Sequence, residues 1–301
     1  MPSRMFSNPR WLAPALAACV TAAYCGRAPD VPTLFESLPP EATGIDFRND
    51  LRPTESFNMY IFRNFYNGGG AAIADVDGDG LPDVFFTGNM VSNRLYRNLG
   101  GFRFEDATAS AGLESDGYWS TGASFADVDG DGDLDLFVAL SGPPEGPGRS
   151  NRLYLNRGDG TFEDRTAEWG VEHVGLGTSA VFFDAQGDGL LDLLLLSNPI
   201  EPLGDFDGAV GAARRERGGG DLRFYVNKGD RFEDATEQAG FYSNRFSFPL
   251  SASLTDFDGD GDTDVYMAND FFERDYLYLN DDAGRFQERF EEPLVRSSSL
   301  S

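Results

Sequence analysis

Four copies of one nine-residue acidic pattern constrain this chain more than any other feature of its sequence. The copies are DVDGDGLPD (75–83), DVDGDGDLD (127–135), DAQGDGLLD (184–192) and DFDGDGDTD (256–264). Carboxylates this close repel one another, which favours a cation among them. Ca²⁺ takes roughly six to eight oxygen ligands, and the intervening glycines permit the tight bend that wraps such an ion. Asp and Gly also form ordinary turns, but four copies with the same spacing favour four calcium-binding loops.

Within each loop, positions 1, 3, 5, 7 and 9 are expected to supply the oxygen ligands. Gln186 replaces the aspartate at position 3 of the third loop, so three strong calcium sites and one weaker site are predicted. An EF-hand is excluded for the first loop, because Phe86 stands where its Glu would be and the flanking residues are typical of strands. The predicted ligands are Asp75, Asp77, Asp79, Leu81 and Asp83; Asp127, Asp129, Asp131, Asp133 and Asp135; Asp184, Gln186, Asp188, Leu190 and Asp192; and Asp256, Asp258, Asp260, Asp262 and Asp264.

The segments around the loops repeat as well. Each loop is followed by a short apolar run (VFFTGN, LFVAL, LLLLSN, VYMAND), which is typical of a strand buried on both faces. An apolar-aromatic hairpin then follows, at 93–113, 151–171, 222–241 and 275–290. One unit is therefore strand, acidic loop, strand, strand, turn, strand. Four antiparallel strands in about fifty residues are the size of a β-propeller blade, so an all-β fold is predicted.

The amino terminus is typical of a targeting segment. Arg4 and Arg10 are followed by the apolar WLAPALAACVTAAY, which is too short to span a bilayer and has the size of a signal-peptide core. Residues 1–25 are therefore predicted to be a signal, 26–43 a tether and 44–301 the repeats. The sequence LAAC resembles a bacterial lipobox, with lipid expected on Cys19. Cleavage at Cys25 and an ordinary cleaved signal are the alternatives.

Composition excludes several classes of function. The formal net charge of −26 argues against nucleic acid as a partner, and membrane contact is expected only through a lipid anchor. His173 is the single histidine, which removes most histidine-based catalysis and most zinc sites.

At the level of families, the DxDGDGxxD loops resemble the FG-GAP and VCBS repeats of integrin-α-type β-propellers. The combination of NGGGAAIADVDGDGLPDVFFTGN with NRLYxN and FEDATxxAG resembles the ASPIC/UnbV, or cartilage acidic protein-like, family from about Gly44 to the end. The resemblance implies a calcium-stabilised propeller that is secreted, periplasmic or attached to the cell surface, and that is used for adhesion or ligand binding.

The predicted function is a non-enzymatic module that binds a protein or glycan ligand. The alternative is an extracellular polysaccharide lyase or hydrolase on the same scaffold, but such an enzyme needs a positioned base or carboxylate pair, and the loops account for most carboxylate clusters. The Arg-Gly-Asp sequence at 157–159 is interpreted as hairpin-turn chemistry. Loop residues expected to contact a ligand are Tyr118, Trp119, Arg214, Arg215, Arg217, Phe271, Phe272 and Arg274.

The number of repeats is small for a propeller, which closes its ring with typically four to eight blades. The four units end near Phe290. The sequence therefore predicts an incomplete ring of about four blades, from a fragment that is poorly soluble or self-associating when expressed alone.

Overall fold

A computed structural model describes residues 34–142, 149–199, 220–242, 244, 246–270, 273–281 and 283–289. The chain divides into two compact units, Met1–Pro39 and Pro40–Ser301, and the second contains every sheet. The predicted signal at 1–25, with Cys19 and Cys25, lies outside the described residues. In the part of the chain that is described, no helix has the length and apolar character needed to cross a bilayer.

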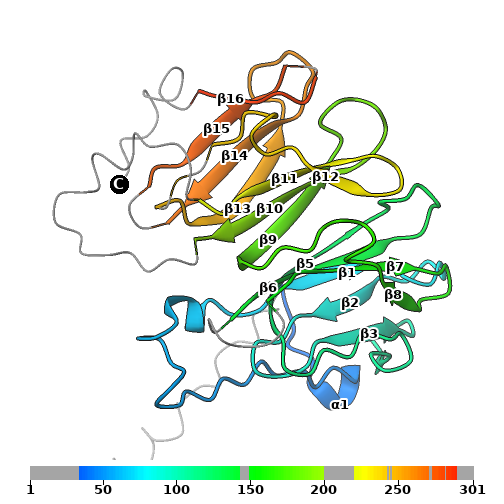
Figure 1. Ribbon diagram of the computed structural model, residues 1–301. Coiled ribbons are helices and arrows are strands. Elements are labelled where there is room, and N and C mark those ends of the chain that lie inside the picture. The colour runs from blue at the N-terminus through cyan, green and yellow to red at the C-terminus, as the bar shows by residue number, and fades with distance from the viewer. Residues whose placement is uncertain are drawn as a thin grey trace, which may run out of the picture. The chain divides into compact units, whose positions relative to one another are not determined.

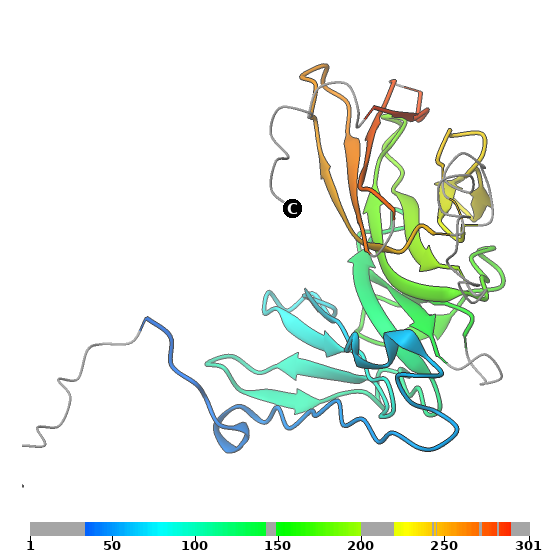
Figure 2. The same ribbon diagram turned by 90° about the vertical axis from the view of Figure 1, so that its left-hand side faces the viewer.

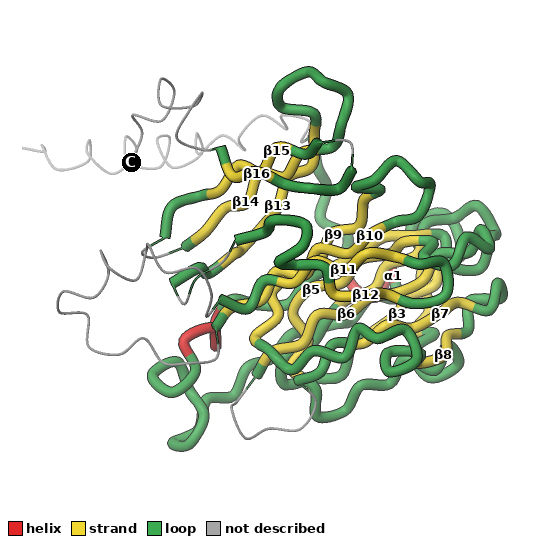
Figure 3. The backbone as a smooth tube through the Cα atoms, turned by 45° about the horizontal axis from the view of Figure 1, so that its top comes forward, coloured by secondary structure: helices red, strands yellow, loops and turns green. Residues whose placement is uncertain are grey.

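The fold consists of four antiparallel sheets of four strands each, and the strands of each sheet follow one another in chain order (Figures 1 and 3). Sheet 1 contains β1 (Ala71–Ala74), β2 (Asp83–Phe86), β3 (Arg94–Asn98) and β4 (Phe104–Asp106), and sheet 2 contains β5 (Trp119–Ala126), β6 (Asp135–Ser141), β7 (Arg152–Asn156) and β8 (Phe162–Asp164). Sheet 3 contains β9 (Leu176–Phe183), β10 (Asp192–Asn198), β11 (Arg223–Asn227) and β12 (Phe232–Asp234), and sheet 4 contains β13 (Pro249–Thr255), β14 (Asp264–Asn269), β15 (Tyr276–Leu279) and β16 (Gln287–Glu288). Each is consistent with a propeller blade, which confirms the predicted all-β class.

Every acidic loop connects the first and second strands of its sheet, and the hairpins that follow supply the third and fourth strands. The prediction that the second strands are buried on both faces is confirmed for β6 and β10, in which every residue is buried. It is wrong for β2 and β14, in which two of four and three of six residues are only half-buried. The reason is position, because sheets 1 and 4 come first and last among the described sheets, and no described sheet covers the outer face of either.

Consecutive sheets pack through their first strands, because β1 contacts β5, β5 contacts β9, and β9 contacts β13. Glycine permits the closest of these approaches. A Cβ atom on Gly122 of β5 would lie 2.8 Å from the carbonyl oxygen of Thr178 and 2.9 Å from the Cα atom of Ser179, both on β9. Hydrophobic clusters fill the space between consecutive sheets. Phe85 belongs to the cluster between sheets 1 and 2, and Phe224 belongs to the cluster between sheets 3 and 4. The four sheets do not close into a ring (Figure 2).

A turn after the fourth strand fastens each sheet to the next. The backbone amide of Phe162 in sheet 2 donates to the carbonyl of Ala111 after sheet 1, at 2.9 Å. Phe232 and Phe286 make the same bond to the turns that follow sheets 2 and 3. The short helix α1 (Pro40–Thr43) is followed by Gly44, where an added Cβ atom would clash with the carbonyl oxygen of Phe104. The segment around Gly44 therefore packs against the last hairpin of sheet 1. The turns that connect consecutive sheets pack in the same way against sheets 2, 3 and 4.

An aromatic cluster covers the start of β5. Trp119 packs against Phe57, Phe62 and Phe65, with ring centroids 5.1 to 5.4 Å apart, and the 3-10 helix η2 (Arg63–Tyr66) carries the last of these rings. Trp119 is 4% exposed. The expectation that Trp119 contacts a ligand is therefore wrong, because neighbouring aromatic side chains cover its ring.

Candidate metal centres

The backbone of each acidic loop is bent by two glycines in the left-handed region. In the first loop, Gly78 and Gly80 have φ angles of 71° and 84°. A residue with a side chain adopts such angles only at a cost, which explains the fixed DGDG core of the pattern. The Asp75 carboxylate accepts hydrogen bonds from the backbone amides of Asp79 and Gly80, at 3.1 and 2.8 Å. Asp184 of the third loop accepts the same two bonds. Asp127 and Asp256 also accept the amide at position 6, but their other donor is the glycine at position 4.

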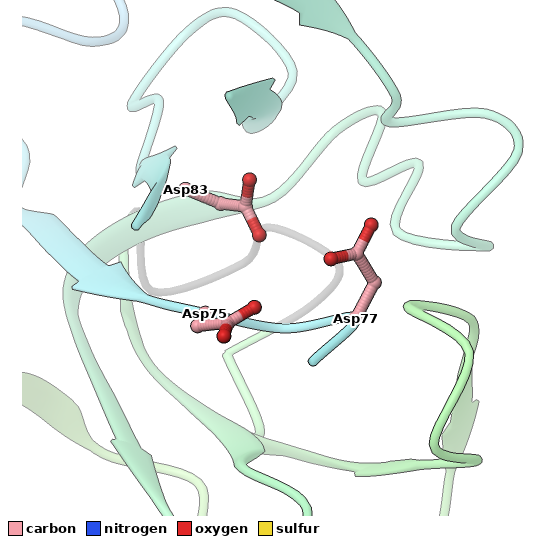
Figure 4. Close-up of side chains that lie close together, drawn as sticks. All are labelled: Asp75, Asp77 and Asp83. Carbon is pink, nitrogen blue, oxygen red and sulfur yellow. The ribbon is translucent and has the colours of Figure 1, made fainter. Parts of the chain in front are cut away.

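Three of the loops bring carboxylates together. In each, one oxygen from each of three aspartates lies within 4.8 Å of the others. Figure 4 shows the first loop, where the side chains of Asp75, Asp77 and Asp83 point toward a common centre. The donor set is entirely oxygen and carries like charges in a small volume, which fits Ca²⁺. The groups are Asp75, Asp77 and Asp83; Asp127, Asp129 and Asp135; and Asp256, Asp258 and Asp260.

The clusters contain only part of the predicted ligand sets. Asp79 and Asp131, at position 5, lie outside the groups of the first two loops, and Asp264, at position 9, lies outside the group of the fourth. The oxygens at position 5 accept hydrogen bonds from backbone amides two residues later, as in Asp79 with Leu81 at 2.8 Å.

The aspartate at position 9 is buried in all four loops, and in the first two it belongs to the carboxylate group. Asp135 is 1% exposed, and its two oxygens accept backbone amides of Val128 and Asn156, at 3.0 and 2.9 Å. Burial raises the pKa of Asp135 to about 7 and that of Asp192 to about 6, while these amide bonds oppose the shift. The position-9 carboxylate extends from the second strand into the loop. Keeping it buried and ionised without a nearby positive charge costs free energy.

An arginine already neutralises part of the first site. Arg97 of β3 forms an ion pair with Asp77, whose side chain is 7% exposed. A Cβ atom on Gly160, in the β7–β8 turn, would lie 3.2 Å from the Cβ of Asp77. Asp77 is therefore enclosed by its own sheet and by the next.

The third loop keeps the same backbone but not the same charge. Asp184 and Asp188 accept backbone amides as their counterparts do, and Asp192 is 1% exposed. Among the described acidic, histidine and cysteine side chains, those of this loop form no group of three within 4.8 Å. Gln186 lies under the turn of sheet 4, because a Cβ on Gly284 would lie 2.7 Å from its Cγ.

A set of asparagines that sequence reasoning missed joins each of the first three loops to the following sheet. The side-chain amide of Asn156 donates to the carbonyl of Val76, at position 2 of the first loop, at 2.8 Å. Asn227 makes this bond to Val128 at 2.8 Å, and Asn280 makes it to Ala185 at 2.9 Å. The signal was present in the sequence, since each asparagine ends an LYxN-like strand of the repeated hairpin.

His173 lies in the loop that precedes β9, where its side chain contacts a carboxylate. Its Nε2 lies 2.9 Å from Oδ2 of Asp221, and Ser197 donates its hydroxyl to the same oxygen at 2.7 Å. A hydrolase relay requires the serine to bond the histidine, which in turn bonds the aspartate. Here the serine and the histidine both contact the aspartate, so the arrangement does not activate Ser197.

The structure also places the Arg-Gly-Asp sequence and two of the residues expected to contact a ligand. The Arg-Gly-Asp sequence lies in the β7–β8 turn, where Asp159 accepts the backbone amide of Thr161 at 3.0 Å, which confirms the hairpin interpretation. Tyr118 lies beneath the guanidinium of Arg152, and Arg274 forms a bidentate pair with Glu288 at 2.8 and 2.6 Å. The others, Arg214, Arg215, Arg217, Phe271 and Phe272, lie outside the described residues.

Comparison with known proteins shows which repeat this chain contains. A family model described as FG-GAP-like repeat matches residues 57–138 and 139–195, which span the first three acidic loops. Residues 57–195 are FG-GAP-like repeats. It is also similar to Cartilage acidic protein 1 of Mus musculus and of Homo sapiens, with 31% identity over 154 residues in each case. The aligned part is 48% of this chain and 23% of each relative.

The FG-GAP matches begin before β1 and continue into β10, so they include the aspartate clusters of the first two loops. The fourth sheet lies beyond the matched residues, yet it repeats the strand order and the loop geometry of the others. The repeat therefore extends structurally to β16.

Proposed function

We propose that this FG-GAP-repeat protein is a calcium-loaded, non-enzymatic module outside the cytoplasm that binds a protein or glycan ligand. The observation that carries the calcium assignment is the convergence of three carboxylates within 4.8 Å in each of the first, second and fourth loops. When bound, Ca²⁺ supplies positive charge that offsets the repulsion among these carboxylates. The chain's own contribution is the preformed loop, held by backbone amides and by one buried aspartate.

The calcium role that fits this arrangement is structural. In the first two loops the position-9 aspartate of the group belongs to the second strand, while positions 1 and 3 belong to the loop, so an ion would fasten the loop to its strand. In the first three loops the position-2 carbonyl is also bonded to the next sheet. Calcium at these loops would thereby stabilise the junction between sheets and present the opposite loops for binding.

A polysaccharide-acting enzyme remains the less supported alternative. The aspartates that converge lie in the calcium loops, and Ser197, His173 and Asp221 are not connected as a nucleophile relay. Both relatives carry the name of a cartilage acidic protein, and neither name describes an enzyme.

Calcium binding is tested by isothermal titration of the purified, decalcified protein. We expect three strong sites, with dissociation constants on the order of 10⁻⁴ to 10⁻³ M, as in other extracellular calcium modules. Asp129→Asn and Asp258→Asn should each remove one site. The matched control is Asp159→Asn, an exposed turn aspartate outside the loops, which should leave the stoichiometry unchanged. Absence of calcium binding, or equal losses in all three variants, would refute the assignment.

Localisation outside the cytoplasm is supported by the signal-like amino terminus and by the family. We propose that lipid on Cys19 attaches the mature protein to a membrane. Mass spectrometry of the mature amino terminus tests this, with a diacylglyceryl-modified Cys19 as the expected result. An unmodified terminus beyond residue 25 would contradict it.

A further inference from the structure

The three junctions between consecutive sheets use the same two halves. The outgoing half of a sheet is the carbonyl at position 2 of its acidic loop, together with the outward residues of its first two strands. The incoming half of the next sheet is the asparagine that ends its third strand, together with an apolar residue on its first strand. Asn156, Asn227 and Asn280 complete the pairs at the three junctions. An outgoing half therefore needs an asparagine donor and an apolar side chain from its partner, and an incoming half needs a free carbonyl and an apolar surface.

The outgoing half of sheet 4 is exposed. Phe257, at position 2 of the fourth loop, is 43% exposed, whereas Val76, Val128 and Ala185 are 4, 1 and 3% exposed at the same position. No described residue donates a hydrogen bond to the Phe257 carbonyl. On β13, Ser253 faces outward beside Tyr266, its partner across the strand pair, and is exposed.

The incoming half of sheet 1 is exposed as well. Ile73 of β1 is 67% exposed, while Phe125 and Phe182, at the same position in sheets 2 and 3, pack against the junction clusters. Among the described residues, the side-chain amide of Asn98 donates only to the carbonyl of Pro82, within its own sheet, at 2.8 Å. Its counterpart Asn156 makes the equivalent bond to Leu134 and adds the bond across the junction.

We propose that the outgoing face of sheet 4 binds the incoming face of sheet 1 in a second copy of this chain. Both halves of a junction that the fold builds three times are present on one molecule, so the contact continues an existing interface. In it, the amide of Asn98 donates to the carbonyl of Phe257, and Ile73 covers the surface around Ser253 and Tyr266. The contact is heterologous, so it produces a closed ring if the rotation permits and an open chain otherwise.

Sedimentation velocity of the full chain in calcium-containing buffer, over a wide range of protein concentration, tests the proposal. The wild-type protein should associate above its 32.9 kDa monomer mass. Ile73→Arg blocks the incoming face and Ser253→Arg blocks the outgoing face, and each should weaken association by about tenfold or more. The matched controls Ile61→Arg and Ser110→Arg place the same charge at exposed sites outside both faces and should associate like the wild type.

Mixing the two blocked variants distinguishes this contact from a symmetric one. Each retains the face that the other lacks, so an equimolar mixture should form a dimer that does not grow, at concentrations where each variant alone stays monomeric. A wild-type protein that stays monomeric, an association that both variants leave intact, or a mixture that stays monomeric would overturn the proposal. Circular dichroism verifies that the variants are folded. If Ile73→Arg is not, Asn98→Leu replaces it as the block of the incoming face.

Discussion

The side-chain amide of Asn156 in β7 lies 2.8 Å from the carbonyl oxygen of Val76, eighty residues earlier in the first acidic loop. The same amide donates to Leu134 in its own sheet at 3.2 Å. One side chain therefore bonds the carbonyls of two acidic loops in two sheets. Because Asn227 and Asn280 repeat this arrangement, each of the first three acidic loops is fixed from outside its own sheet.

Asn156→Ala should destabilise the fold by about 2 to 4 kcal/mol, because it leaves two carbonyls without their donor at a junction where Asn156 is 5% exposed. Urea unfolding followed by circular dichroism measures the change. Asn98→Ala is the matched control, since this asparagine bonds only the loop of its own sheet. It should cost about 1 kcal/mol. Equal losses for the two variants would show that the bond between sheets contributes nothing.

Arg97→Gln should separate fold stability from calcium response. Without calcium the variant should melt at a lower temperature than the wild type, because Asp77 loses its ion-pair partner. With calcium its melting temperature should rise more than that of the wild type, because the ion no longer competes with the guanidinium. Differential scanning calorimetry in chelator and in calcium measures both, with exposed Arg103→Gln of the same sheet as control. An unchanged calcium response would show that Arg97 and the ion do not share Asp77.

Gln186→Asp should strengthen the third site by restoring a carboxylate at position 3. Asp is shorter than Gln, so it fits beneath Gly284 without displacing the turn of sheet 4. Calorimetric titration should detect tighter binding at this loop, and the calcium-induced rise in melting temperature should increase. Gln186→Asn tests shortening without charge and should not produce the gain. If Asn and Asp behave alike, charge at position 3 does not control affinity.

Gly122→Ala should lower the free energy of unfolding by about 1 to 3 kcal/mol, because the new methyl group meets the backbone of β9 at less than 3 Å. Chemical denaturation is the measurement. Gly101→Asn is the contrasting control: its φ of 62° is one that Asn tolerates, and no heavy atom lies within 4 Å of the added Cβ. A stable Gly122→Ala protein would mean that β5 and β9 can separate without cost.

The sequence by itself determined the repeat, the all-β class and the shape of each acidic loop. These features depend on contacts between residues close in sequence, such as the amide of Gly80 with Asp75, and on the left-handed angles that Gly78 and Gly80 adopt. The hairpin turn at Asp159 was predictable for the same reason, because its bond to Thr161 spans two residues.

Only the tertiary structure decided which of these similar units are covered. Position 2 is buried at Val128 and exposed at Phe257 because sheet 3 follows the second loop and no described sheet follows the fourth. Aromatic side chains from residues 57–65 cover Trp119, which was expected to contact a ligand. His173 contacts Asp221, which lies forty-eight residues later in the sequence. Burial depends on which distant segments pack together, and a local pattern repeated four times carries no information about its neighbours in space.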